Sequence, residues 1–432
     1  MRFRSTNHQC PEVSLREAVL RGLAADGGLY MPAVMPELPA EFFARLGGMT
    51  LPQIGFEVGK LFLGEDVPED IIHTIVAKAL NFPAPLVTLS GGFHVLELFH
   101  GPTLAFKDFG ARFMARLMGY FVRDAEKELT VLAATSGDTG SAVAHGFFGV
   151  PGIRVVILYP SGRVSKAQEK QFTTLGGNIA ALEVAGSFDD CQRLAKKALT
   201  DADLAGSLSL TSANSINIAR LIPQMFYYFG ACAQLKESAS PVVLSVPSGN
   251  FGNLTAGVMA KCMGLRVAQF IAATNANDVV PQYLKDGEFR PQPSRRTISN
   301  AMDVGNPSNF ARMTDLYEDN LTALRADVWG AGFSDAETEH AMRVTKEQSA
   351  YLLDPHTAVG LLGLRAFQRE RNTSCQGIIL GTAHPAKFAE VVERATGARV
   401  PVPEPLAECL SRPGQSVPLA NRYADLREFL LA

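Results

Sequence analysis

The sequence predicts an α/β protein with a mostly parallel sheet that is covered by helices on both faces. From about residue 91 onward, short apolar runs typical of strands alternate with segments whose apolar residues recur at helical spacing. Such alternation indicates parallel strands joined by crossover helices. Polar loops rich in small residues follow three of the apolar runs, at 134–140, 211–217 and 246–253. Ligands of parallel sheets bind beyond the carboxyl ends of the strands, so we expect a site where these loops meet.

Length and composition exclude several classes of protein. A chain of 432 residues is too long for one core, so we expect two or three domains. Hydrophobic residues make up 47% and charged residues 19%, as in an ordinary soluble globular protein. The net charge is -3 and no basic stripe occurs, which argues against nucleic acid as a partner. No apolar run reaches the roughly 18 residues of a membrane span, and the first residues lack a signal peptide's apolar core.

The cysteines and histidines indicate neither a metal site nor a disulfide framework. The six cysteines are scattered and never form a C-x-x-C pair, and no two of the eight histidines are four residues apart. This usage favours a reducing cytoplasm and no metal.

Residues 1–90 are predicted to form a small, mostly helical domain. Apolar residues recur at helical spacing over 15–23 and again over 69–80, and two prolines within 81–85 close the region.

The alternating pattern gives a specific set of elements beyond residue 91. Strands, several with the loops that follow them, are expected at 95–99, 129–134, 154–160, 178–185, 207–215, 241–253, 266–275 and 377–388. Helices are expected from 107 onward and at 141–148, 164–176, 189–201, 216–235, 254–264, 335–354, 357–371 and 420–432. The segment 284–310 has no clear period and reads as a long loop or a lid.

Lys107 lies at the junction between a loop and a helix, in apolar surroundings. Asp108 is a plausible N-cap, and the apolar residues that follow it fall four apart. Burial between Phe106 and Phe109 disfavours the ammonium, which lowers its pKa and frees an amine for Schiff-base chemistry. The competing interpretation is a lysine that lays its stem on the core and extends its charge to water.

The loop at 246–253 has the features of a phosphate cradle. Gly249 and Gly252 allow close approach of the backbone, and the helix that follows offers free N–H groups to an anion. The competing interpretation is a tight strand-to-helix turn.

The loop at 134–140 places several hydroxyls at another strand-to-helix turn. Thr135, Ser136 and Thr139 suit a carboxylate or phosphate, whereas Asp138 is a poor ligand for an anion. A cluster that only caps the helix is the alternative.

The third loop combines amides, a hydroxyl and a guanidinium. Asn214, Ser215, Asn217 and Arg220 form a phosphate-binding set, because arginine binds phosphate through paired hydrogen bonds. An ordinary surface arginine is the alternative for Arg220.

A lysine amine in an apolar niche, together with two anion sites, is what a pyridoxal phosphate enzyme needs. The motifs HGPTLAFKDFG, ATSGDTG, PSGNFGN and TAHPAKF, with the opening VSLREAVLRGLAADGGLYMP, closely resemble threonine synthases of the longer bacterial and fungal type. The resemblance runs nearly end to end. It implies the tryptophan synthase β-like fold (fold type II), with two parallel α/β layers. The catalytic region would span 91–432, with large and small subdomains and the active site between them.

The resemblance also implies an activity. It is the pyridoxal phosphate-dependent conversion of O-phospho-L-homoserine and water to L-threonine and phosphate, the last step of threonine biosynthesis. The enzyme would be a lyase acting on a phosphate ester, and a monomer or homodimer.

Roles follow for residues at matching motif positions. Lys107 would carry the cofactor and shuttle protons. The cofactor would be held by Asp138, Gly249, Asn250, Phe251, Gly252, Asn253 and Thr382. The substrate would be bound by Thr135, Ser136, Thr139, Asn214, Ser215, Asn217 and Arg220. Asp138 stands where related enzymes often carry asparagine, and we expect its charge to tune the Schiff base rather than to bind substrate.

Two other functions fit parts of the pattern. A serine or threonine dehydratase would share the lysine and the cofactor cradle but would not need the second anion site. A binding protein that kept the fold without catalysis would lack the lysine, which is present here as Lys107.

Overall fold

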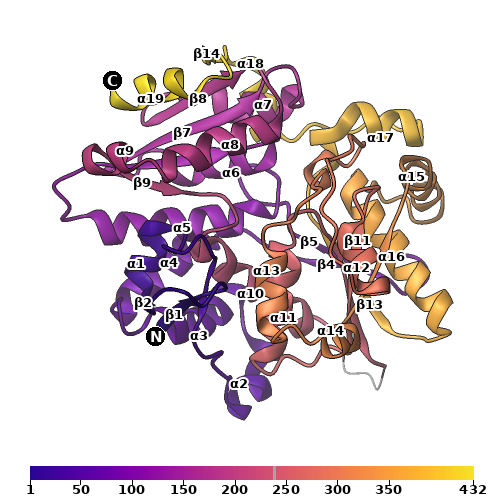
Figure 1. Cartoon of the computed structure of the whole chain (residues 1–432). Helices are drawn as coiled ribbons and strands as arrows, with labels where there is room; N and C mark the ends of the chain where they lie inside the picture. The colour runs from indigo at the N-terminus through magenta and orange to yellow at the C-terminus, as the bar shows by residue number, and fades with distance from the viewer. Residues whose placement is uncertain (237–239) are drawn as a thin grey trace.

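Two parallel sheets and one small antiparallel sheet organise the chain in the computed structural model, which describes residues 1–236 and 240–432. The two larger sheets form separate lobes, and helix α10 (Ile218–Ala233) lies between the lobes and packs against a helix of each (Figure 1). None of the helices in the described part of the chain is long and apolar enough to cross a membrane.

The first lobe is built on a five-stranded, fully parallel sheet. In spatial order its strands are β14 (Val417–Leu419), β8 (Ile179–Val184), β7 (Ile153–Pro160), β6 (Leu129–Ala134) and β9 (Ser209–Ser212). Its helices are α5 (Lys107–Val122), α6 (Asp138–Phe147), α7 (Lys166–Thr173), α8 (Phe188–Leu199), α9 (Ala202–Ser207) and α19 (Tyr423–Leu431). Val131 of β6 lies in the core cluster that includes α5 and α6, and Leu132 lies in the cluster that includes α8 and α19. Burial on both faces explains the continuous apolar run that predicted the strand.

The second lobe is built on a six-stranded sheet that is parallel except at one edge. In spatial order its strands are β12 (Val328–Gly332), β11 (Gln269–Thr274), β10 (Val242–Pro247), β13 (Gln376–Gly381), β5 (His94–Glu97) and β4 (Leu86–Thr88). Its helices are α11 (Gly252–Cys262), α12 (Val279–Asp286), α13 (Phe310–Leu316), α14 (Leu321–Asp327), α15 (Asp335–Ser349), α16 (Pro355–Arg371) and α17 (Ala389–Thr396). The long apolar helix α10 (Ile218–Ala233) packs against both α5 and α11 and so joins the lobes.

The N-terminal region combines helices with a three-stranded antiparallel sheet. Its elements are β1 (Arg2–Ser5), β2 (Val13–Ser14), α1 (Leu15–Arg21), β3 (Tyr30–Pro32), α2 (Ala40–Arg45), the 3-10 helix η1 (Leu46–Gly48), α3 (Leu51–Leu63) and α4 (Glu69–Ala79). The sequence did not predict the small sheet, because its strands are too short to show a period. In this region α3 packs on α10 and α4 packs on α5. The region lies below the first lobe in the view of Figure 1.

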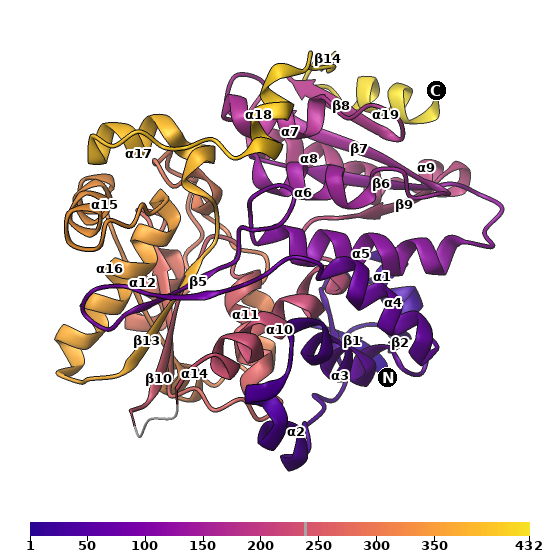
Figure 2. The ribbon, with the colours of Figure 1, turned by 180° about the vertical axis from the view of Figure 1, so that it is seen from behind.

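The C-terminal segment crosses from one lobe to the other. After β13, the chain forms the 3-10 helix η3 (Pro385–Phe388) and α17 beside the second sheet. It then continues through α18 (Glu404–Ser411) to β14, which pairs with β8 of the first sheet (Figure 2). The crossing places η3 against α7, between the two lobes.

Several predicted boundaries were wrong. Asp108 is not the N-cap of α5, since the helix begins at Lys107 and Phe106 occupies the cap position. The helix expected at 335–354 ends at Ser349, and Asp354 instead caps α16 by accepting hydrogen bonds from backbone N–H groups. The helix expected from 141 begins at Asp138, so that the last three residues of the loop at 134–140 belong to its first turn.

The segment expected at 284–310 as a loop or a lid is almost without regular structure. Beyond the end of α12 it contains one 3-10 turn, η2 (Asn300–Met302). Asp303 fixes the segment by accepting hydrogen bonds from Thr297 and Asn275. Ala301, Met302 and Val304 line the pocket described next.

Candidate active site

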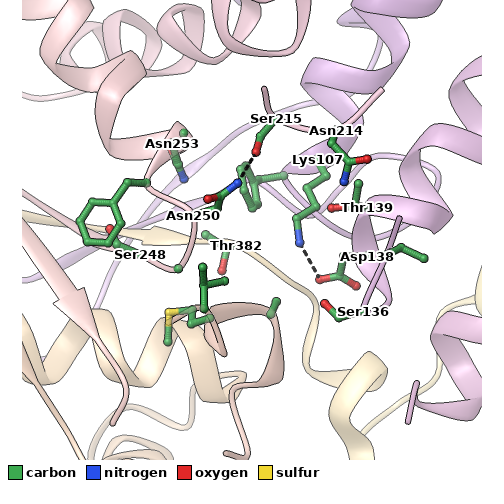
Figure 3. Close-up of a pocket in the computed structure, with 18 of the residues that line it drawn as sticks. Lys107, Ser136, Asp138, Thr139, Asn214, Ser215, Ser248, Asn250, Asn253 and Thr382 are labelled. Atoms are coloured by element: carbon green, nitrogen blue, oxygen red, sulfur yellow. Dashed lines mark hydrogen bonds and ion pairs between the residues drawn. The ribbon is translucent and has the colours of Figure 1, made fainter. Parts of the chain in front are cut away.

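A pocket lies between the lobes, where the carboxyl ends of β6, β9, β10 and β13 meet (Figure 3). Fourteen of the predicted site residues line it: Lys107, Thr135, Ser136, Asp138, Thr139, Asn214, Ser215, Arg220, Gly249, Asn250, Phe251, Gly252, Asn253 and Thr382. Among the predicted residues, Asn217 does not line the pocket. The three loops selected from the sequence therefore meet at one place.

Lys107 opens helix α5, and its amine faces the pocket. The side chain is 16% exposed, and Nζ lies 3.9 Å from Oδ2 of Asp138 and 5.6 Å from the centre of the Phe106 ring. Burial lowers the pKa of Lys107 to about 8; Asp138 acts in the opposite direction. A lysine with this pKa holds a substantial fraction of free amine near neutral pH, as Schiff-base chemistry requires.

Asp108 supports the turn that leads to Lys107. Its carboxylate accepts hydrogen bonds from the backbone N–H of Thr103 at 2.9 Å and from the Thr103 hydroxyl at 2.7 Å. Burial raises the pKa of Asp108 to about 6, against the effect of these hydrogen bonds. The residue predicted as a helix cap instead holds the preceding turn in place.

Asp138 is a buried carboxylate between two lysines. Its Oδ2 faces Lys107, while its Oδ1 accepts from Nζ of Lys387 at 2.7 Å and from Nε2 of Gln168 at 2.8 Å. Burial alone would raise the pKa of Asp138, but the charges of Lys387 and Lys107 and the two hydrogen bonds hold it well below its ordinary value. The carboxylate is therefore ionised throughout the neutral range.

The loop after β10 forms a cradle at the start of α11. Phe251 has a φ of 61°, a left-handed conformation that bulky residues seldom adopt. A Cβ atom on Gly249 would lie 2.7 Å from Cα of Met302, so only glycine fits where the 284–310 segment crosses the loop. Asn253 accepts hydrogen bonds from the hydroxyls of Tyr227 and Tyr228, and its Nδ2 is buried without a partner in the described structure.

Arg220 brings a buried positive charge to the same pocket. It is 2% exposed, which excludes the surface arginine considered from the sequence. Its Nη1 donates to the carbonyl of Ala213 at 2.7 Å, and burial lowers its pKa to about 10. Within residues 1–236 and 240–432, Arg220 forms no close ion pair, although the charge of Asp108 acts on it from farther away and opposes the effect of burial on its pKa. Its Nε has no hydrogen-bond partner there. A buried cation that forms no close ion pair suits an anionic ligand.

Ser215 joins the cradle to the third loop. Its hydroxyl accepts a hydrogen bond from Asn250 at 2.8 Å (Figure 3). It accepts another from Asn309 at 3.0 Å. The loops after β9 and β10 are thereby fixed relative to each other.

Three predicted substrate ligands have their polar atoms engaged within the fold. The hydroxyl of Thr135 accepts from the N–H groups of Gly137 and Gly140. The amide of Asn214 bridges to the N–H and carbonyl of Ala134. Asn217 is fully buried, caps α10 and donates to the carbonyls of Val19 and Ser212. Ser136 and Thr139 are only half-buried and lie open to the pocket.

Two residues that hold Asp138 were missed from the sequence. Lys387 and Gln168 lie far along the chain from Asp138, and neither stands in a small polar loop. A signal for Lys387 existed, because it follows a buried strand within TAHPAKF, as Lys107 does in its own motif. His356 also lines the pocket, with Nδ1 at 2.7 Å from Asp354 and Nε2 accepting from the N–H of Ala301.

Comparisons with known proteins agree with this geometry. Three family models match: threonine synthase N terminus over residues 2–80, pyridoxal-phosphate dependent enzyme over 79–377, and threonine synthase C-terminal over 357–430. Threonine synthase from Escherichia coli (strain K12) is 45% identical over 97% of this chain and 97% of its own. The chain belongs to the threonine synthase family.

Solved structures of threonine synthases extend this agreement to the fold. The crystal structure from Escherichia coli has a TM-score of 0.93 at 44% identity, covering 100% of this chain and 99% of that one. A threonine synthase from Brucella melitensis with bound pyridoxal phosphate has a TM-score of 0.92 at 35% identity, covering 100% and 99%. The predictions of the family, the α/β fold, the pyridoxal phosphate cofactor and threonine synthesis as the activity are confirmed.

The residues of the pocket fit the cofactor of this threonine synthase family. Lys107 supplies an amine of lowered pKa for the aldehyde. The cradle at 249–253 presents the N-terminus of an eleven-residue helix, which favours a phosphate group. The Nδ2 of Asn253, which has no partner in the described structure, adds a buried donor that needs an acceptor.

Replacing Asp138 by asparagine tests whether the carboxylate acts on Lys107. Asp138→Asn keeps the shape and removes a negative charge 3.9 Å from Nζ, so the pKa of the Lys107 nitrogen should fall by about one unit or more. The pH midpoint of the bound cofactor's visible absorption reports this change. KM for the substrate should change little or fall. An unmoved midpoint combined with a large rise in KM would make Asp138 a substrate ligand instead.

Proposed function

We propose that the pocket converts O-phospho-L-homoserine and water to L-threonine and phosphate. The observation that carries the proposal is the joint presence of Lys107, with its lowered pKa, and Arg220, a buried cation that lines the same pocket without a close ion pair in the described residues. Lys107 supplies an amine for cofactor chemistry. Arg220 suits a second phosphate, that of the substrate, beside the phosphate of the cofactor. A dehydratase acting on serine would bring no substrate phosphate to Arg220, which favours the phosphorylated substrate.

We infer distinct roles for the residues around the substrate. Arg220 binds the substrate phosphate, because a guanidinium forms strong charge-assisted hydrogen bonds with phosphate oxygens. Ser215 and Asn214 shape the same side of the pocket. The half-buried hydroxyls of Ser136 and Thr139 bind the substrate carboxylate. The engaged side chains of Thr135 and Asn217 position these loops rather than touch the substrate.

Lys107 is the residue best placed to move protons. When bound, pyridoxal phosphate supplies an electron sink that stabilises negative charge on the substrate carbon skeleton. Lys107 takes the proton from Cα and then removes a proton from Cβ, after which phosphate leaves from Cγ. Lys107 next returns a proton to Cγ, and water adds at Cβ. Its nitrogen must both accept and release protons near neutral pH, which a pKa of about 8 allows. Arg220 stabilises the departing phosphate as its charge develops.

Thr382 completes the proposed cofactor site from the end of β13. It is 5% exposed and lines the pocket near Asn250 of the cradle (Figure 3). We propose that its hydroxyl faces the pyridine nitrogen. A hydroxyl is a weak partner and leaves that nitrogen largely without a proton, so that correct placement of Lys107 matters more.

Removing the amine of Lys107 tests the role given to that residue. Lys107→Ala should abolish threonine formation, because both the covalent attachment of the cofactor and the proton-transferring base are lost. The fold should persist, as judged by circular dichroism and thermal unfolding. Lys261→Ala is a matched control, since Lys261 forms a 2.7 Å ion pair with Asp327 and does not line the pocket. Measurable steady-state turnover by pure Lys107→Ala would refute the assignment.

Arg220→Ala tests which phosphate the guanidinium binds. A charge-assisted contact to phosphate is worth ~1.5–3 kcal/mol, so KM for O-phospho-L-homoserine should rise by about one to two powers of ten. The dissociation constant of pyridoxal phosphate, measured by fluorescence titration, should change much less. If both constants rise equally, Arg220 serves the cofactor phosphate and the two proposed anion sites are exchanged.

A further inference from the structure

Lys387 is a second buried lysine beside the site. Its side chain is fully buried on η3, five residues after Thr382. Lysine is almost never buried without a partner, because its ammonium loses the water that solvates it. The contacts of Lys387 therefore call for an explanation beyond packing.

The ammonium of Lys387 binds two segments that surround Lys107. Nζ lies 2.7 Å from Oδ1 of Asp138 and donates at 2.7 Å to the carbonyl of Thr103, in the turn that leads to Lys107. The other carboxylate oxygen of Asp138 faces Lys107 at 3.9 Å. Three charged side chains from three separate segments thus lie in a row, in the order Lys387, Asp138, Lys107.

We propose that Lys387 is a positioning residue for the reaction: its ammonium keeps Asp138 ionised and turned toward Lys107, whether or not the Lys107 nitrogen carries a proton.

The net charge of the row differs between the two protonation states of Lys107. With Lys107 protonated, the row holds two positive charges and one negative charge. When Lys107 releases its proton, the closed pair of Asp138 and Lys387 remains. Without Lys387, the same release would leave Asp138 as a lone buried anion, which is strongly unfavourable. Lys387 therefore makes proton release from Lys107 easier.

The electrostatics of the site agree with this role. The positive charge of Lys387 lowers the pKa of Lys107. It also lowers the pKa of Asp138, and its effect there is larger than that of the other charged group, Lys107. The charge of Lys387 also acts on titratable groups of several neighbouring segments: Asp108 of α5, His145 of α6, His384 at the start of η3 and Cys409 of α18. Burial lowers the pKa of His145 to about 4 and also lowers that of His384. Arg220 is a further cation that acts on Lys107 itself.

A purely structural role for Lys387 makes a different prediction. If the ion pair only fastened η3 to the loop at 134–140, its loss would lower stability and would leave the titration of Lys107 unchanged. A measurement of that titration separates the two roles. It also needs no turnover, so its outcome is independent of the substrate assigned under the proposed function, although the inference relies on Lys107 as the proton-transferring residue.

The test is a pH titration of the visible absorption of the cofactor-loaded protein. Lys387→Met should raise the pH midpoint by at least about one unit, and Lys387→Arg should restore it toward the wild-type value. Lys261→Met is the control, because it removes a lysine from an ion pair of equal length outside the pocket. The pH dependence of Lys107 acetylation in the cofactor-free chain should move in the same direction. A folded Lys387→Met with an unmoved or lowered midpoint overturns the proposal.

Two further measurements cover the case in which Lys387→Met does not fold. Lys387→Gln removes the charge but can still donate a hydrogen bond to Asp138, and it should raise the midpoint in the same way. In the unaltered protein, the side-chain carboxyl carbon of Asp138, observed by ¹³C NMR, should keep the chemical shift of a carboxylate throughout the titration of Lys107. Protonation of Asp138 within that range would contradict the proposal without any variant.

Discussion

A buried carboxylate that faces two ammonium groups is the interaction on which the site depends. Asp138 lies 2.7 Å from Lys387 and 3.9 Å from Lys107, and all three side chains are largely withdrawn from water. Buried charges persist only when they are paired, so removal of Asp138 or Lys387 would leave a buried charge without its partner, whereas removal of Lys107 leaves the pair of Asp138 and Lys387 intact. Because they come from α6, η3 and α5, the row also requires that the two sheets meet correctly. The three charged side chains of the site are therefore brought together only when the two lobes are correctly assembled.

The α/β architecture could be predicted because each strand and helix has its own local pattern of apolar residues. Strands buried on both faces, such as β6 and β7, read as continuous apolar runs, and the helices between them show their own period. The polar loops were identified because small polar residues directly follow the apolar runs of the predicted parallel strands. Fourteen of the fifteen predicted site residues consequently line one pocket.

Such local patterns do not show which segments pair when they are distant in the sequence. No local signal shows that β13 pairs with β5, or that β14 returns to the first sheet beside β8. Lys387 was overlooked for the same reason, since its partner Asp138 is remote in sequence. Polar side chains that only hold the fold also resemble ligands: Asn217 was predicted to bind substrate, yet its amide caps α10 and joins it to α1. Asp108 shows the converse error, because a side chain expected at a helix end serves the preceding turn.

The presence of two buried lysines gives the central claim its most direct test. Lys107 has a lowered pKa and an amine that faces the pocket, whereas Lys387 is fully buried and bound to a carboxylate. Only the former should react with the cofactor aldehyde. Borohydride reduction of the cofactor-loaded protein, followed by peptide mapping with mass spectrometry, locates the attachment. The account predicts a pyridoxyl group on the peptide containing Lys107; a label on Lys387, or an absence of label, would contradict it.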